Sequence, residues 1–349
     1  VGSPNGATQA KLSTGSTLLN LGCSGHASYG MLGGHFYFFV GDSGSGKTWV
    51  TMSLFAEACI NNDFSDYRLI HDNAENGALM DLRKYFGETM ANRLEPPRTD
   101  NDTGVPQYSG TVEEFYWNVD TAFKQGKPFI YILDSMDALT TSDESDKFQE
   151  SKEAATKGKE VSGTYGTSKA KLNSSYIRVI FNKLRQTGSI LVVVCQTRAN
   201  IGFGAQFNPK TRAGGLALTF YSSLELWTSI EGHLKKNVKG KAREQGIYCK
   251  VRIKKNRLTG KDRTVSFPIL HSAGIDDIGG CCDYLVDEKY WKEKEGKISA
   301  PEFNFTGDRE KLIQHIEENN LEKDIRFLVS NAWDEIENLS EVKRKSRYA

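Results

Sequence analysis

Several features that mark other classes of protein are missing from this sequence. No apolar run approaches the ~20 residues that a membrane-spanning helix needs. The first residues show no secretory signal. The six cysteines form no CxxC pair, and the adjacent Cys281 and Cys282 are poorly placed for a disulfide bridge or a zinc site. We therefore expect reduced cysteines, a cytosolic protein and no membrane partner.

The chain also has almost no net charge. Its 45 Lys and Arg balance 44 Asp and Glu, which gives a formal net charge of +1 and excludes a general binder of polyanions. The charge is uneven, however. Residues 235–263 carry 12 bases against two acids, and residues 301–340 carry 10 acids against four bases. This asymmetry predicts a face for nucleic acid, or complementary patches on neighbouring subunits; the alternative is an ordinary solvated surface.

The apolar pattern predicts an α/β fold with a mainly parallel central sheet. The 349 residues are 38% hydrophobic, enough for one large core with or without a small satellite domain. Buried strands are predicted at residues 35–40, 68–71, 128–133 and 189–195. Helical spacing is found at residues 48–60, 112–124 and 172–184. Continuous apolar strands that alternate with helices indicate a parallel sheet covered by helices on both faces.

The second half of the chain has a different texture. Residues 216–229, 246–255 and 264–270 read as strands joined by short turns, which favours antiparallel pairing at one edge of the sheet. Residues 310–339 are helical and acidic. The charged residues 141–161 contain no apolar run and predict an exposed insertion or a disordered loop. We divide the chain into a leader (1–11), a core (12–286, with the insertion at 141–160), and a small helical C-terminal lobe with a basic tail (287–349).

One motif carries the chemistry most clearly. It follows the strand predicted at residues 35–40, opens the next helix and fits GxxxxGK[ST], the pattern of a phosphate-binding P-loop. Its residues are Gly41, Asp42, Ser43, Gly44, Ser45, Gly46, Lys47 and Thr48. Glycines let the backbone N–H groups face a phosphate, and the helix N-terminus adds positive potential. Lys47 is expected to reach the β- and γ-phosphates of ATP, and the Thr48 hydroxyl to bind Mg²⁺.

Three polar residues at strand ends are candidates for completing this site. Asp134 ends the strand at 128–133 and is expected to anchor Mg²⁺ through water; its alternative role is a helix N-cap. Hydrolysis needs a carboxylate to orient or deprotonate water, and Glu75 is slightly favoured over Asp72 on position. Gln196 follows the strand at 189–195 and precedes a stretch rich in Gly, Asn and Arg. We interpret it as a γ-phosphate sensor, and a strand-capping glutamine is the alternative.

The order of motifs resembles the RecA recombinase family over roughly residues 12–290. The resemblance begins with Leu12–Ser16 and Asn73–Glu75. It is strongest from Gln196 to Gly202, at Phe207–Pro209 and from Gly214 to Ser223, which look like the second DNA-binding loop of the family and the strand after it. Lys255-Asn256-Arg257, Phe267–Leu270 and Gly274-Ile275 continue it.

The resemblance implies a RecA-like P-loop ATPase that polymerises on single-stranded DNA and exchanges strands with a homologous duplex. ATP and Mg²⁺ would be its cofactors. Glu75 would be the water-activating residue and Gln196 the γ-phosphate sensor. Lys255 and Arg257 would reach the ATP of a neighbouring subunit. Partners implied are single-stranded DNA, double-stranded DNA during pairing, further copies of the chain, and single-strand-binding and mediator proteins.

The DNA contacts follow from the same resemblance and from side-chain chemistry. Arg198 offers a charged fork for phosphate, Gly214 and Gly215 permit close backbone approach, and Ile201 matches a family position that wedges between bases. Phe203 or Phe207 would stack on a base or tuck under the loop. The full set of expected DNA-binding residues is Lys169, Lys171, Arg198, Asn200, Ile201, Phe203, Phe207, Lys210, Arg212, Gly214 and Gly215.

The sequence also departs from the usual bacterial pattern. The first DNA-binding loop is placed at residues 161–172, where Ala170 is too small for a second wedge, and Lys169 and Lys171 are expected to contact phosphate instead. No helical polymerisation segment is seen before residue 12, and residues 343–347 are basic. These departures favour a compact, divergent relative of the phage-encoded UvsX type, acting in the cytosol of a bacterium or of a phage-infected host.

Two other functions share the P-loop. A hexameric RecA-fold helicase is one, although it leaves the match at Gly214-Gly215 unexplained. A nucleotide-binding paralogue or mediator with poor turnover is the other. Intact Lys47, Glu75 and Gln196 argue against it, because a decayed paralogue would be expected to lose some of these residues.

Overall fold

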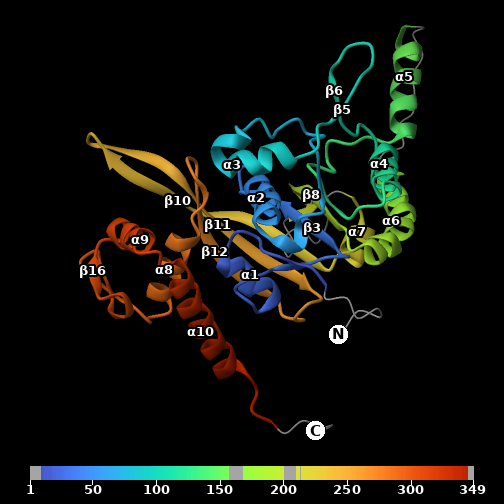
Figure 1. The fold of residues 1–349 in the computed structure, drawn as a ribbon. Coiled ribbons are helices and arrows are strands. Elements are labelled where there is room, and N and C mark those ends of the chain that lie inside the picture. Colours follow the sequence, from blue (N-terminus) through green and yellow to red (C-terminus); the bar gives the residue numbers. More distant parts are fainter. Residues whose placement is uncertain (1–8, 157–167, 200–209, 213, 345–349) are drawn as a thin grey trace.

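A computed structural model describes residues 9–156, 168–199, 210–212 and 214–344 (Figure 1). Within these residues the largest element is a nine-stranded sheet in the order β13-β12-β11-β10-β3-β8-β7-β4, with β9 paired to β8. Its strands are β3 (Phe36–Gly41), β4 (Arg68–Asp72), β7 (Phe129–Leu133), β8 (Ile190–Ala199), β9 (Lys210–Arg212), β10 (Leu224–Val238), β11 (Lys241–Asn256), β12 (Arg263–Leu270) and β13 (Gly274–Ile275).

The sheet is parallel from β4 to β10 and antiparallel beyond it. The parallel ladders are β4–β7, β7–β8, β8–β3 and β3–β10. The strands β10, β11, β12 and β13 then pair antiparallel, as β8 does with β9. This confirms the predicted parallel sheet with an antiparallel edge. The carboxyl ends of the parallel strands share one edge, where α/β proteins place their ligand sites.

Helices cover both faces of this sheet, as the apolar runs predict. The helices are α1 (Thr17–Ser24), α2 (Lys47–Ile60), α3 (Leu82–Arg93), α4 (Val112–Lys124), α5 (Ser142–Thr156), α6 (Ser168–Thr187), α7 (Leu216–Tyr221), α8 (Asp277–Asp287), α9 (Arg309–Glu318) and α10 (Glu322–Ser340). Along β3, Tyr37 and Phe39 enter the core beneath α1 and α2, whereas Phe36 and Phe38 enter the core beneath α4 and α6. The aromatic run is therefore buried on both sides, because successive side chains of a strand alternate between faces.

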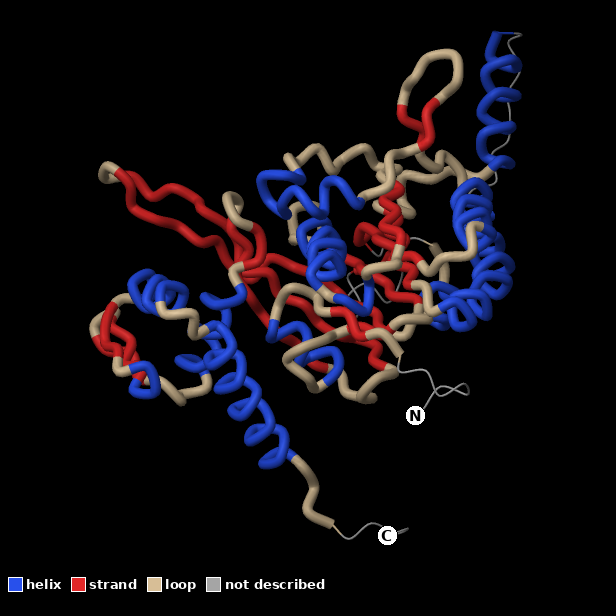
Figure 2. The backbone as a smooth tube through the Cα atoms, viewed as in Figure 1, coloured by secondary structure: helices blue, strands red, loops and turns tan. Residues whose placement is uncertain are grey.

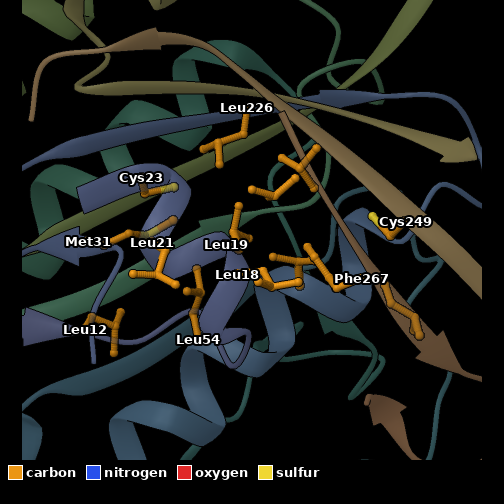
Figure 3. Packing of buried hydrophobic residues seen from close by; sticks show 14 of the residues in the cluster. Leu12, Leu18, Leu19, Leu21, Cys23, Met31, Leu54, Leu226, Cys249 and Phe267 are labelled. Carbon is orange, nitrogen blue, oxygen red and sulfur yellow. The ribbon is translucent and has the colours of Figure 1, made fainter. Parts of the chain in front are cut away.

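The larger core extends from α1 and α2 to the C-terminal end of the chain. Figure 3 shows Leu18 and Leu19 of α1 pointing toward Phe267 of β12 and Leu226 of β10. Each of these side chains is almost completely buried. Burial of a large apolar side chain stabilises a fold by about 1.5–3 kcal/mol, so this packing fixes the antiparallel edge against the helical layer.

The remaining strands form small sheets. They are β1 (Lys11–Leu12) with β2 (Met31–Leu32), β5 (Arg98–Thr99) with β6 (Pro106–Gln107), and the three-stranded set β14 (Lys292–Lys294), β15 (Lys297–Ala300) and β16 (Phe305–Gly307). The predicted C-terminal helices are present as α9 and α10, but the three-stranded sheet before them was not predicted. The proposed boundary at residue 286 stays a prediction.

Two sequence-based assignments need correction. Residues 142–156 belong to the segment predicted as an exposed insertion or a disordered loop, and they form α5, which projects from the core (Figure 1). The exposed insertion is therefore confirmed for these residues, whereas the disordered loop is wrong. Thr141 Oγ1 accepts a hydrogen bond from the backbone N–H of Glu144 at 3.1 Å, as an N-cap does. The segment has no glycine or proline, so a lack of apolar residues excludes burial but not a helix.

The predicted strand at 216–229 is the second error. Its first part is the short helix α7, and β10 begins only at Leu224. Gly215, with φ of 78°, precedes the helix, and the backbone N–H of Ser223 then donates to the carbonyl of Phe36 at 2.7 Å. The chain therefore turns before it joins the sheet. No helix within the described ranges has the length and apolar content needed to cross a membrane.

Candidate nucleotide site

The P-loop connects β3 to α2 at the carboxyl edge of the sheet, as the motif predicts. A Cβ atom on Gly41 would lie 2.0 Å from Thr228 Oγ1 and 2.7 Å from Ser45 Oγ. Gly46 has φ of 91°, and a Cβ there would lie 2.7 Å from Ile269 Cδ1. Position 41 requires glycine for space, and position 46 requires it for backbone conformation as well. The loop ends at the N-terminus of α2, whose dipole attracts an anion.

Lys47 lies inside the loop. Its Nζ donates to the carbonyls of Gly41 at 2.9 Å and Asp42 at 2.7 Å. Burial lowers the pKa of the Lys47 ammonium, and the nearby carboxylates of Asp134 and Glu75 partly offset that effect. The loop therefore holds a cation that is stripped of most of its water, where its field acts most strongly on a phosphate.

Thr48 and Asp134 meet beside the loop. Thr48 Oγ1 donates to Asp134 Oδ2 at 3.0 Å, and burial raises the pKa of the Asp134 carboxyl. No helix follows Asp134 directly, so the N-cap alternative does not apply. Within the described residues, no cluster of three or more His, Cys, Asp or Glu side chains could hold a metal. One hydroxyl and one carboxylate fit Mg²⁺, which keeps several waters of its own.

The structure separates the two carboxylates that compete for the role of catalytic base. Asp72 is buried and accepts hydrogen bonds from Ser109 N at 2.9 Å, Ser109 Oγ at 2.5 Å and Tyr131 Oη at 2.6 Å. Its oxygens are thus occupied by structural donors. Glu75 lies beside Asp134 instead, because its backbone N–H donates to the Asp134 carbonyl at 2.9 Å. Glu75 is therefore the carboxylate of the pair that faces the phosphate loop.

Gln196 contacts Glu75 directly. Its Nε2 donates to Glu75 Oε1 at 2.7 Å, and Ser135 Oγ donates to the other carboxylate oxygen at 3.1 Å. The register places Gln196 opposite Gly41, so the glutamine lies at the level of the P-loop. Its side chain is thus part of the carboxylate network rather than a cap on its own strand.

A second link runs from the P-loop to the β8–β9 segment. The Asp42 carboxylate accepts hydrogen bonds from Thr197 Oγ1 on β8 and from Lys210 Nζ on β9. These two donors lower the pKa of Asp42 below its usual value. Thr197 and Lys210 flank residues 200–209, which include Asn200, Ile201, Phe203 and Phe207. These four predicted DNA-binding residues lie outside the described part of the chain.

The other predicted DNA-binding residues fall into two groups. Arg198 is exposed and contacts Asp137 at 3.2 Å. Lys169 and Lys171 lie on α6, which begins at Ser168, so the last five residues of the loop predicted at 161–172 are helical. Lys169 is partly buried and Lys171 is exposed, and both extend from a helical backbone.

The second group, Arg212, Gly214 and Gly215, is partly or fully buried. The guanidinium of Arg212 is buried between Glu225 at 3.2 Å, the Gly215 carbonyl at 2.8 Å and the ring of Phe38. In this conformation it is not free to contact a phosphate. A Cβ on Gly215 would lie 2.7 Å from Ala170 Cβ, so the glycine and the small alanine let α6 pack closely against this turn. Gly214, with φ of 86°, meets Leu218 in the same way.

Lys255 and Arg257 lie at the far end of the sheet from their own P-loop. Lys255 pairs with Glu225, which pairs with Phe38, three residues before Gly41. Three residues of strand span about 10 Å. Both side chains bind the C-terminus of α7: Lys255 Nζ donates to the Thr219 and Phe220 carbonyls at 2.5 and 2.8 Å, and Arg257 donates to the Phe220 carbonyl at 2.7 Å.

Sequence reasoning missed two residues of the site. Asp137 accepts a hydrogen bond from the backbone N–H of Gln196 at 2.6 Å and also contacts Arg198. Thr228 closes the P-loop from β10 through a 2.6 Å hydrogen bond to Ser45. Of these two residues, only Asp137 could have been predicted from the sequence. It lies three residues after Asp134, so it is a second acid at the end of the same strand.

Comparison with known proteins adds the family. Residues 119–276 match the family described as "RecA N-terminal domain". The chain is thus similar to the RecA family, and two further relatives extend the similarity over most of its length. Protein RecA of Thermosynechococcus vestitus is 26% identical over 312 residues, covering 88% of this chain and 77% of that protein. Protein RecA of Rickettsia bellii is 25% identical, covering 86% and 78%.

Another relative has a higher sequence identity over a shorter stretch of the chain. Protein RecA of Trichodesmium erythraeum is 32% identical over 176 residues, which cover 48% of this chain and 48% of that protein. Here the chain spans about half the length of the relative. The family matches the expectation drawn from the ordered motifs, whereas the finer placement near phage recombinases stays a prediction.

Proposed function

We propose that this chain is a DNA-dependent ATPase that forms filaments on single-stranded DNA and promotes pairing and strand exchange with a duplex. The observation that carries the proposal is the pair of contacts between the phosphate site and the β8–β9 segment. Gln196 binds Glu75, and Asp42 binds Thr197 and Lys210. A change at the phosphate site would therefore be felt at both ends of residues 200–209, the segment expected to bind DNA.

ATP and Mg²⁺ fit the residues of the site. The backbone of Gly41–Thr48, with Lys47, would hold the phosphates, and Thr48 with Asp134 would hold the metal ion. The bound metal would neutralise charge that develops on the phosphates. Glu75 would orient and deprotonate the attacking water, and its place beside Asp134 supports that role.

Oligomerisation is supported by the position of Lys255 and Arg257. These cations lie too far along the sheet to reach the phosphates of their own subunit. The family resemblance assigns them to the neighbour's ATP, and a shared site of this kind would make full hydrolysis depend on the filament. A cation supplied in trans stabilises charge in the transition state of phosphoryl transfer.

Electron microscopy with single-stranded DNA and a slowly hydrolysed ATP analogue tests the proposal. Helical filaments are expected. Closed rings would favour the helicase instead and would overturn the proposal. DNA binding is also expected to weaken steeply with salt, because phosphate contacts release counterions. A flat salt response would contradict the expected phosphate contacts.

A further inference from the structure

The hairpin of β10 and β11 projects well beyond the sheet (Figures 1 and 2). Pairing of β10 with β3 ends at Thr228, and pairing of β11 with β12 begins only at Gly246. From Lys235 to Glu244 the two strands pair only with each other, and each of these residues except the turn glycine has its side chain in solvent. We call residues 235–244 the ribbon. The ten residue-to-residue steps from Thr228 to Val238 span about 33 Å.

The charge of the ribbon lies mainly on one face. Register pairs Lys236 with Arg243 and Val238 with Lys241, so these four side chains share a face that holds three cations and no acid. On the opposite face Lys235 lies across from Glu244. Like charges directly opposite each other destabilise a strand pair, so the Lys236–Arg243 pair is not explained by ribbon stability. Charged side chains can also prevent an exposed strand pair from associating with strands of other chains. A mixture of acids and bases would do this equally well, so this role does not explain a face with cations alone.

A carboxylate of the C-terminal lobe already contacts this face. Lys236 Nζ lies 2.7 and 2.8 Å from the two oxygens of Glu310, in the first turn of α9. Lys241 and Arg243 have no acidic partner among the described residues. Glu310 therefore marks where an anion is held, and it neutralises one of the three cations on the face.

The shape and composition of the ribbon favour a duplex over a single strand. A two-stranded β-ribbon fits the major groove of B-DNA, which is about 12 Å wide. Proteins that hold single strands use aromatic side chains as stacking platforms, and the ribbon has no aromatic residue. We propose that the face formed by Lys236, Lys241 and Arg243 binds the phosphate backbone of double-stranded DNA, with the ribbon along the major groove. The proposal rests on the proposed function, because it names where the duplex partner would bind.

Matched substitutions on the two faces test the proposal. Lys241→Ala removes one charge from the cationic face, and Lys235→Ala removes one from the other. Fluorescence anisotropy of a short labelled duplex, with the full chain and no nucleotide, measures affinity at several salt concentrations. Lys241→Ala with Arg243→Ala is expected to raise the duplex Kd about tenfold and to reduce the salt slope by about two. Lys235→Ala is expected to change the duplex Kd by less than about twofold. The double variant is expected to change the Kd for the matching single strand by less than about twofold.

A gain-of-binding variant gives a second readout. Glu310→Gln frees Lys236 and is expected to lower the duplex Kd by about threefold, which a merely damaged fold would not do. Equal losses from the Lys235 and Lys241 variants, or unchanged duplex binding in the double variant, would overturn the proposal. So would a double variant that loses self-association without DNA and keeps duplex affinity, because the partner would then be a second copy of this chain.

The same samples separate this proposal from the proposed function. Hydrolysis stimulated by single-stranded DNA is expected to be unchanged in the double variant, since the ribbon lies outside the phosphate site. If the unmodified chain shows no such hydrolysis, the proposed function fails. The comparison of duplex affinities still stands in that case, because it is made without nucleotide.

Discussion

The side-chain amide of Gln196 donates a hydrogen bond to Glu75 Oε1 over 2.7 Å. The amide of Gln196 and the carboxylate of Glu75 come from different strands of the sheet, and Gln196 is followed directly by Thr197, which binds Asp42 of the P-loop. One short segment of β8 therefore contacts both the predicted catalytic carboxylate and the phosphate loop. Its substitution should separate hydrolysis from the response to DNA.

Gln196→Ala is expected to reduce stimulation of ATP hydrolysis by single-stranded DNA about tenfold, the usual size of a coupling between two sites. Nucleotide affinity should be unchanged, because Lys47 and Thr48 are intact. Steady-state hydrolysis with and without DNA measures the ratio, and Gln125→Ala, at an exposed helix end, is the control. Normal stimulation in the Gln196 variant would show that the glutamine plays no part in coupling.

Glu75→Gln is expected to lower catalysis, whereas Asp72→Asn is expected to lower stability. The first should lower kcat by about 10²–10⁴-fold while ATP still binds, because a general base is lost. The second disturbs a buried carboxylate with three donors and should lower the free energy of unfolding by about 1–3 kcal/mol. Single-turnover hydrolysis and thermal melting distinguish the two. A stable Asp72 variant that has lost catalysis would reverse the assignment.

Lys255→Ala combined with Arg257→Ala should abolish DNA-stimulated hydrolysis, by about 10³-fold or more, and leave nucleotide binding by the isolated subunit intact. A mixing experiment makes the test sharper. Subunits with this double change keep the P-loop, and subunits with Lys47→Ala keep the cations. If the cations act in trans, a mixture of the two inactive variants should recover part of the activity. Two variants that stay inactive together would argue for action within one subunit.

The pH dependence of assembly should report on Lys255. Burial, together with the charge of Arg257, lowers the pKa of its ammonium to about 8, and Glu225 partly offsets this. A neighbour's phosphate favours the charged form and would raise that pKa on assembly. Assembly would then take up a proton above about pH 8, so it should be constant below that pH and weaken as the pH rises beyond it.

Light scattering with the ATP analogue measures this pH effect. Lys255→Arg should remove the dependence, because arginine stays charged throughout the range. The same fall in the arginine variant as in the unmodified chain would assign the pH effect to another group.

The features that could be predicted from sequence are those set by local chemistry. The P-loop needs glycine at positions 41 and 46, and the run before it is buried on both faces, so motif and strand were found together. The helix α5 could not be predicted, because a polar segment without apolar residues is compatible with an exposed helix as well as with a loop. The short helix α7 was missed because Leu216–Tyr221 is apolar enough for a strand.

Long-range contacts account for the rest of the differences. Sequence position favoured Glu75 only slightly over Asp72, and the distinction depends on Ser109 and Tyr131, which are distant in the chain. The burial of Arg212 against Glu225 was equally invisible. Lys255 and Arg257 were found through resemblance alone, since no local pattern indicates an action on another subunit.

Lys255 and Arg257 donate hydrogen bonds to the last carbonyls of α7, so a movement of these two cations would affect the helix. α7 follows Gly215, at the end of the segment that leads from the P-loop through β9. A subunit whose two cations turned to a neighbour's ATP would release the end of its own α7. ATP bound by one subunit would then loosen α7 of the neighbour that supplies the cations, and by linkage the state of that α7 would change the affinity for this ATP. Each subunit would therefore be coupled through its ATP to the neighbour on one side and through its cations to the neighbour on the other.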